Sequence, residues 1–214
     1  MSADFASTQL SHHFLIAMPG LEDPTFAKSV VYLCEHSERG AMGLIINKPG
    51  DLSLKHLFEK VELPLKREDL LQSNVLHGGP VQTERGFVLH EPMLEHDSVD
   101  SENAASTDAE AAPTKTNSIY ASTLSVPGGL AMTTSKDVLE AMANGSGPKR
   151  VLVTLGYASW GEGQLESEIG ENSWLTVEAD PAVIFDTPIE QRYDKALSLL
   201  GLQAWMLSNE AGHA

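Results

Sequence analysis

The sequence predicts a single α+β domain, residues 1–214, built on a mixed, largely antiparallel sheet. The chain has 214 residues, of which 42% are hydrophobic, enough to bury one substantial core. Short runs rich in β-branched and aromatic residues outnumber the helical patterns. These runs occur in adjacent pairs more often than in alternation with helices, which is typical of antiparallel α+β architectures.

The first third of the chain predicts three strands followed by a helix. The strand runs are HHFLIAM, SVVYLCEH and MGLIIN, and each is bounded by segments rich in turn formers. Residues 37–40 are few enough to join the second and third runs as a hairpin. From Leu54 to Val61 apolar residues recur at three- and four-residue spacing, which predicts a helix that ends before Pro64.

The middle of the chain predicts two strands and then an insertion. NVLHGGPV and RGFVLHEP read as strands, and GGP between apolar runs signals a turn. From Met93 to Asn117 the chain is acidic, rich in small residues and nearly free of aromatic residues. Such a segment cannot bury enough apolar surface to offset its ordering entropy, so we predict a flexible acidic insertion at about residues 95–117.

The last third predicts five strands and two helices. The strand candidates are SIYASTLSV, LAMTT, KRVLVTL, SWLTVEA and PAVIFD. One helix is predicted within residues 135–145, between a serine and a glycine. TPIEQRYDKALSLLG predicts a second helix, with Thr187 as its cap, Pro188 in the first position, Glu190 completing a capping box and Gly201 as its stop.

Charge and composition narrow the classes of function. Against 30 acidic residues stand 14 basic ones, giving a formal charge of -16 that repels phosphate backbones and anionic lipid surfaces. The N-terminus has no basic segment followed by an apolar one, and no run approaches the roughly 18 apolar residues of a membrane span. The single cysteine, Cys34, excludes an internal disulfide. We therefore expect a cytoplasmic protein that does not bind nucleic acid directly or enter a membrane.

The stretch VTLGYASWGEGQLESEI resembles the surroundings of a hydrolase nucleophile, with Ser159 in the middle. The G-x-S-x-G motif does not fit, because Gly161 is correctly placed but Tyr157 occupies the position of the first glycine. The only histidine downstream is His213, beside the C-terminus, where a general base is poorly positioned. We predict no catalytic residue here, and interpret the stretch as a glycine-permitted strand-to-helix turn that contains Ser159.

Other chemical motifs are weak as well. The eight histidines are scattered and show no HExxH motif, and the glycine pairs match neither a P-loop nor a dinucleotide fingerprint, so we predict no metal site and no cofactor. We expect the histidines to form hydrogen bonds at strand ends. Glu35, His36 and His90 remain acid/base candidates if strand ends converge. TTSKD invites a Ser/Lys catalytic interpretation, but helix capping explains Thr134, Ser135 and Asp137 without catalysis.

Four blocks together resemble the YqgE/AlgH family of bacterial proteins. They are FLIAMPGLEDPTFAKSVVYLCEHSERGAMGLIINKP, HGGPVQTERGFVLH, LAMTTSKDVLEAMANGSGP and LGYASWGEGQLESEIGENSWLTV, in family order from Phe14 to about Leu200. The resemblance implies a small closed β-barrel within a larger, branched sheet flanked by helices, in a bacterial cytosolic protein. It implies no reaction, although one branch carries the label of a transcriptional regulator of alginate production. Family members usually have glycine where this chain has Ser159, so serine chemistry there is not a family function.

Three functional hypotheses follow. The first is a non-enzymatic binding or regulatory protein that engages a protein partner through a surface groove. The residues that the fold alone needs least are the candidates for that surface: Asp23, Glu35, His36, Asn47, Thr134, Ser135, Asp137, Trp160, Gln164 and Glu166. The alternative is an enzyme or small-ligand sensor that uses strand-end Glu and His side chains. A direct transcriptional regulator is less favoured, because the acidic chain has no recognisable helix-turn-helix or basic helix.

Overall fold

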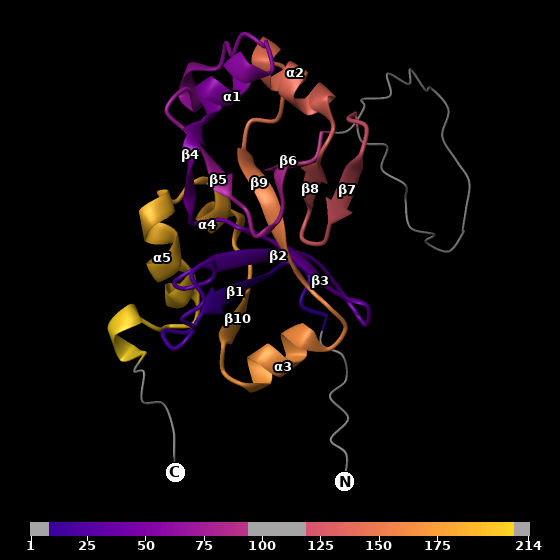
Figure 1. Cartoon of the computed structure of the whole chain (residues 1–214). Helices are drawn as coiled ribbons and strands as arrows, with labels where there is room; N and C mark the ends of the chain where they lie inside the picture. The colour runs from indigo at the N-terminus through magenta and orange to yellow at the C-terminus, as the bar shows by residue number, and fades with distance from the viewer. Residues whose placement is uncertain (1–8, 94–118, 208–214) are drawn as a thin grey trace, which may run out of the picture.

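A computed structural model describes residues 9–93 and 119–207, which form one ten-stranded sheet with helices around it (Figure 1). The predicted acidic insertion at about residues 95–117 lies outside the described residues. The strands are β1 (His13–Ala17), β2 (Val30–Ser37), β3 (Gly40–Ile45), β4 (Pro49–Ser53), β5 (Asn74–His77), β6 (Val81–His90), β7 (Thr123–Val126), β8 (Leu130–Thr133), β9 (Val151–Trp160) and β10 (Trp174–Glu178).

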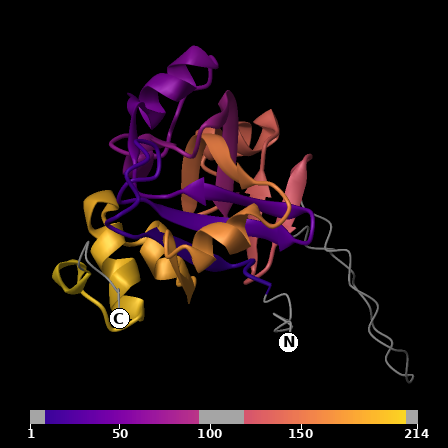
Figure 2. The same cartoon turned by 60° about the horizontal axis from the view of Figure 1, so that its bottom comes forward.

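The helices are short and lie around the sheet. They are α1 (Leu54–Lys60), α2 (Lys136–Asn144), α3 (Gln164–Gly170), α4 (Pro181–Phe185) and α5 (Arg192–Leu199), with the 3-10 turns η1 (Glu68–Leu70), η2 (Ile189–Gln191) and η3 (Ala204–Met206). Figure 1 places α1 and α2 at one end of the molecule and α3 at the other, and Figure 2 shows α3 lying across the strands with α4 and α5 to one side. No helix of the described ranges is long and apolar enough to cross a membrane.

The sheet is mixed, largely antiparallel and branched, as predicted. Its strand order is β10-β1-β2-β3-β9-β6-β8-β7, and β9 pairs in parallel with β5 while its other pairings are antiparallel. One edge of β9 changes partner along its length: Thr154 and Leu155 pair with β5, and residues 158–160 pair with β3. Gly156 lies between the two pairings with φ of +73°, and a Cβ there would lie 2.5 Å from the Gly79 carbonyl oxygen. The branch point therefore requires glycine.

The closed β-barrel that the resemblance implied is not confirmed. The strand order begins at β10 and ends at β7, and no pairing joins these two strands. The described strands form a large curled antiparallel sheet that stays open along β7. An open sheet leaves edge strands with unpaired backbone groups, which a closed barrel would not.

Both faces of β1, and of β2 from Val30 to Cys34, are buried, which explains their continuous apolar runs. Phe14 and Tyr32 face a core that includes residues of α4 and α5. Leu15 and Val31 face a second core, which includes Leu165 of α3. Alternate side chains thus enter different cores, and the polar alternation expected of a strand with one solvated face is lost.

A third core lies between the sheet and the helices α1 and α2. Phe58 of α1 and Val138 of α2 are buried there against Val153 of β9. α1 begins at Leu54, as predicted, and α2 ends at Gly145, whose φ of +83° is the left-handed conformation of a helix stop. The predicted hairpin is also confirmed, because β2 and β3 pair up to Ser37↔Gly40.

The prediction that PAVIFD forms a strand is wrong: the run is α4. Asp180 caps this helix, its Oδ1 accepting a hydrogen bond of 2.8 Å from the Ala182 N–H, and Pro181 occupies a first-turn position. Five apolar residues are too few for periodicity to separate a helix from a strand. The predicted cap of the next helix also fails, because the Thr187 hydroxyl donates to the Ala182 carbonyl at 3.0 Å and so serves the end of α4.

The predicted turn containing Ser159 is displaced. β9 runs without interruption through Ser159, which pairs with Met42, and ends at Trp160. The turn is formed by residues 161–163, and α3 begins directly afterwards. Gly156, the glycine before the predicted turn, marks the branch point inside β9 rather than the start of a loop.

Candidate functional site

The ten residues predicted for a binding surface do not form one surface. Five lie around α3: Asp23, His36, Trp160, Gln164 and Glu166. Three lie at the start of α2: Thr134, Ser135 and Asp137. Glu35 is exposed on the opposite face of β2 from buried His36, and Asn47 follows β3. The first group contains the most polar contacts.

Glu168, which sequence analysis did not select, is the centre of the α3 group. Its Oε2 accepts hydrogen bonds from the indole N–H of Trp160 at 2.9 Å and of Trp174 at 2.8 Å. Its Oε1 accepts from Gln164 Nε2 at 2.9 Å, and Gln164 Oε1 accepts from the Gly161 N–H at 3.0 Å. These bonds join α3 to the ends of β9 and β10, so Trp160 and Gln164 serve the fold.

Asp23 also serves this packing. Its Oδ1 accepts hydrogen bonds from the N–H groups of Thr25 at 2.8 Å and Phe26 at 3.1 Å, which is a side-chain-closed turn. The turn places the Phe26 ring 5.9 Å from Trp160 and 5.6 Å from Trp174, measured between ring centroids. Aromatic rings at these separations attract each other in tilted and edge-to-face arrangements.

His36 holds the N-terminal segment and one residue of α3. Its Nδ1 accepts a hydrogen bond of 3.1 Å from the Leu10 N–H, so the ring proton is on Nε2, which donates to Glu166 Oε1 at 2.9 Å. The ring is buried, while the Glu166 side chain is 53% exposed. Both ring nitrogens are therefore occupied. The pair lines an open cavity of about 580 Å³ together with Glu38 and Glu162.

The second group closes the junction between α2 and β7. Asp137 accepts hydrogen bonds from the Ala121 N–H at 2.7 Å and the Val138 N–H at 2.8 Å, and the Ser135 hydroxyl contacts both Asp137 Oδ1 and the Ala121 carbonyl. Burial opposes ionisation of Asp137, but these hydrogen bonds outweigh it and hold the carboxyl pKa below its usual value. Ser135 occupies the helix cap position without accepting a capping bond. These contacts give the group a structural explanation, because the Ser135 hydroxyl is engaged by Asp137 and the Ala121 carbonyl.

Asn47 and Cys34 are equally well explained by structure. The Asn47 side chain accepts from the Val30 N–H at 2.8 Å and donates to the Lys28 carbonyl at 2.9 Å, which fixes the start of β2. Cys34 is buried, and burial raises its thiol pKa to about 12, so the thiolate is scarce at neutral pH.

The acid/base candidates do not meet in one cleft. His90 is buried, its Nδ1 donating to the Glu91 carbonyl at 2.7 Å and its Nε2 lying 2.9 Å from the Thr133 hydroxyl. Burial lowers the His90 pKa despite that backbone contact. His36 lies in the cavity beside α3, which contains neither Glu35 nor His90. Within the described ranges, no group of three or more His, Cys, Asp or Glu side chains could hold a metal ion.

The curled sheet carries a groove that sequence analysis missed. Its volume is about 410 Å³, and Thr134 lies on it, accepting a hydrogen bond of 3.1 Å from Arg85. The apolar lining comes from five strands: Met42, Phe87, Leu124, Met132 and Tyr157. These residues are far apart in sequence, so no local pattern could reveal the groove.

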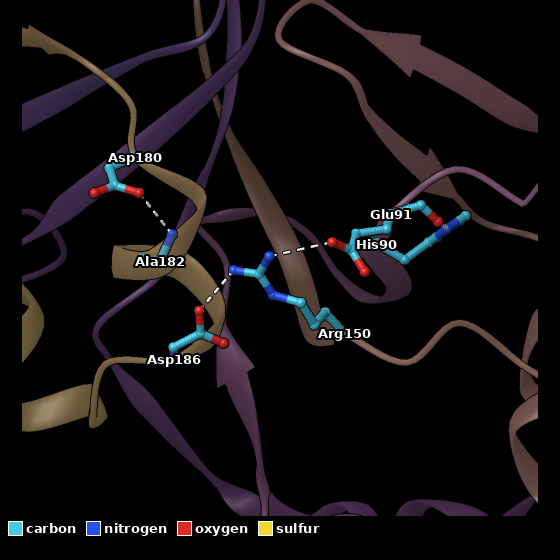
Figure 3. A network of polar contacts seen from close by, with 6 residues as sticks. All are labelled: His90, Glu91, Arg150, Asp180, Ala182 and Asp186. Carbon is cyan, nitrogen blue, oxygen red and sulfur yellow. Dashed lines mark hydrogen bonds and ion pairs between the residues drawn. The ribbon is translucent and has the colours of Figure 1, made fainter.

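A second missed feature is a polar cleft of about 500 Å³ between α4, η2 and α5 on one side and η1 and β5 on the other. One wall is held by Arg150, which donates to Glu91 Oε1 at 3.1 Å and to Asp186 Oδ2 at 2.7 Å (Figure 3). The Arg150 guanidinium also lies over the Phe185 ring, 5.0 Å from its centroid. Buried Arg192 lines the same cleft.

Proteins similar to this chain are known along its full length. The model of the DUF179 family, described as AlgH-like, matches residues 14–205. A UPF0301 protein from Paracidovorax citrulli is 69% identical over 214 residues, and one from Variovorax paradoxus is 66% identical over 214 residues; each alignment covers 100% of both chains.

Two solved structures share the fold. The solution structure of the AlgH protein from Pseudomonas aeruginosa matches with a TM-score of 0.69 and 45% identity, covering 100% of both chains. A crystal structure of a Corynebacterium diphtheriae protein matches with a TM-score of 0.61 over 88% of this chain and 85% of that one. At 19% identity, the second match supports the fold alone.

Proposed function

The chain belongs to the AlgH-like family, and we propose that it works as a non-enzymatic binding protein that takes an extended segment of a protein partner along β7. One observation supports this most: an open edge strand lies directly beside an apolar groove. The partner segment would add a strand to the sheet and place its apolar side chains in the groove. This mode of peptide recognition takes affinity from main-chain hydrogen bonds and specificity from side-chain pockets.

The edge of β7 has backbone groups available for such pairing. Among the described strands, β7 pairs with β8 alone and is the last of the strand order. The Thr134 N–H donates to the Ser122 carbonyl, so Ser122 and Thr134 form a hydrogen-bonded pair. Hydrogen-bonded and non-hydrogen-bonded pairs alternate along an antiparallel ladder, so the backbone N–H and C=O of Leu124 are also directed at β8. Thr123 and Ser125 then direct their N–H and C=O groups outward.

The groove supplies the apolar contact. Leu124 is 39% exposed, and it lines the groove together with the methionines and aromatic rings named above. Methionine side chains are flexible and polarisable, and suit surfaces that adapt to a partner. Arg85 adds a cation whose guanidinium contacts Thr134, Gln82 and the Phe87 ring.

The other hypotheses receive less support. The occupied nitrogens of His36 and the separation of His36 from His90 weaken the acid/base version of the enzyme alternative. Direct DNA binding, which the regulator label of one family branch suggests, is disfavoured because the formal charge of -16 opposes approach to nucleic acid. The small-ligand alternative is supported by the polar cleft that Arg192 lines.

The proposal is tested by selecting a library of linear peptides against the full-length chain and mapping the bound peptide by hydrogen exchange. We expect protection of the Thr123 and Ser125 amides, because pairing along β7 engages the outward N–H groups. Leu124→Asp should weaken peptide binding about tenfold or more, as expected of an apolar anchor. The matched control is Leu199→Asp, because Leu199 is 37% exposed on α5 and should leave binding unchanged.

Two outcomes would contradict the proposal. One is protection that maps to another surface while the β7 amides exchange as before. The other is an equal loss of binding in Leu124→Asp and Leu199→Asp, which would indicate non-specific hydrophobic contact. Deleting residues 95–117 and repeating the measurement tests whether the insertion contributes to the contact or competes with the peptide.

A further inference from the structure

Arg192 is a buried cation without a carboxylate partner. It begins α5 and is 7% exposed; Nε donates to the Thr187 carbonyl at 3.0 Å, and Nη1 donates to the Ile46 carbonyl. Within the described ranges no carboxylate lies within ion-pair distance of it. Burial lowers the Arg192 pKa to about 10, although Glu190 raises it, so the group stays charged at neutral pH. A buried charge held only by neutral carbonyls is costly.

Arg192 lines the polar cleft, and one nitrogen of its guanidinium is unused by the described residues. Nη2 donates no hydrogen bond to any described residue, and it is not among the fully buried nitrogens without a partner, so it reaches solvent. The cleft that Arg192 lines has a volume of about 500 Å³, a size typical of small-molecule sites.

The charges around Arg192 leave room for an anion. Of the lining carboxylates, Asp69 is engaged by Arg67 at 2.5 Å and Asp186 by Arg150 at 2.7 Å. Lys149, at the rim, is exposed. Arg192 and Lys149 are therefore cations of the cleft that no carboxylate of the described chain neutralises by direct contact.

Part of the remaining lining is suited to a polar molecule. Ser73 and Asn74, at the start of β5, contribute hydroxyl and amide groups. Glu190 lines the cleft without an ion pair to a described residue, so it can accept a hydrogen bond from a hydroxyl or amino group.

We propose that this cleft binds a small polar oxyanion, whose phosphate or carboxylate group accepts a hydrogen bond from Arg192 Nη2 and lies near Lys149. Such a ligand supplies the counter-charge that the buried guanidinium lacks, through charge-assisted hydrogen bonds. The site is separate from the β7 groove, so this proposal stands whether or not a partner strand binds there.

The test is a titration of the full-length chain with inorganic phosphate and, separately, with succinate, followed by NMR at constant ionic strength, with chloride as the reference anion. We expect saturable shifts of the Arg192 side chain and of the Ser73 and Asn74 amides with one or both oxyanions, and none with chloride. The preferred anion identifies the chemical group. Shifts that do not saturate, or that spread over the surface, overturn the proposal.

Substitutions distinguish anion binding in the cleft from a general effect of the protein's net charge. Lys149→Glu should weaken binding about tenfold, because it replaces attraction by repulsion at the rim. Lys60→Glu changes the net charge equally but lies on α1 outside the cleft, and should leave affinity unchanged. Arg192→Lys keeps the charge but removes Nη2, and should also weaken binding. If it fails to fold, the comparison of Lys149→Glu with Lys60→Glu decides alone, and equal effects of those two refute the site.

Discussion

The α3 end and the Arg192 cleft are both rich in charged side chains, but they use their hydrogen-bonding groups differently. At the α3 end, Glu168 satisfies two buried indole N–H groups, and His36 uses both ring nitrogens. In the cleft, Arg192 Nη2 donates to no group in the part of the chain that the structure describes. Saturated polar groups stabilise a fold, whereas a buried charge with an unused donor is available for a ligand. An unused donor, rather than residue type, therefore marks a candidate for binding.

The largest effect that tests this contrast is expected from Glu168→Ala. The substitution leaves two buried tryptophan N–H groups without their acceptor and removes the bond to Gln164. Each unsatisfied buried donor costs roughly 1–3 kcal/mol, so we expect a loss of about 3 kcal/mol in the free energy of unfolding. Urea denaturation measures it. A loss no larger than that of an exposed glutamate such as Glu162 would show that the α3 end is not held in this way.

A smaller effect on the free energy of unfolding is expected from a decrease in pH, through the buried His90. His90 donates to the carbonyl of Glu91, whose carboxylate holds Arg150 in the wall (Figure 3). Because burial lowers the His90 pKa, the unfolded chain binds a proton that the folded chain does not as pH falls below about 6.5. Stability should therefore decrease from pH 7 downward, until the folded pKa is reached.

His90→Asn should remove part of this pH dependence, since it lacks the titrating ring. Unfolding free energies of both chains between pH 7.5 and about 5 give the comparison. His12, whose pKa burial also lowers, is present in both chains and so cancels. Identical pH slopes in the two chains would contradict the role assigned to His90.

The smallest effect is expected from Glu166→Gln. The carboxylate is more than half exposed, and an amide oxygen can still accept the His36 Nε2 hydrogen bond. A partly exposed pair contributes about 0.5 kcal/mol or less. Chemical denaturation should therefore hardly distinguish this variant from the parent. A loss near that of Glu168→Ala would mean that the pair carries more of the local stability than its exposure indicates.

Much of the fold was accessible from sequence because local signals were strong. The run of buried strands, the hairpin at residues 37–40 and the helix stop at Gly145 follow from side-chain pattern and turn chemistry. α4 was misjudged because five apolar residues carry no usable period, and β4 was missed because PGDLS has the composition of a turn. Whether the sheet closes depends on which distant strands pair, and local composition does not determine that pairing.

The site was less accessible for the same reason. Asp23, Trp160 and Ser135 were selected because they are polar or aromatic residues within the family-like blocks. In the structure their contacts stabilise turns and helix ends. Glu168 could have been found from its four-residue spacing to Gln164 on one helix face. No such signal exists for the β7 groove or for Arg192, because their surroundings are assembled from distant segments.

The most direct test of the proposed function is photo-crosslinking in living cells, with a photoreactive residue placed at position 124 or at position 166 of the full-length chain. The first position lies on the β7 groove and the second on the saturated α3 end. We predict a discrete protein adduct from position 124 that is absent from position 166. An adduct from position 166 alone would contradict the account and identify the α3 end as the binding surface.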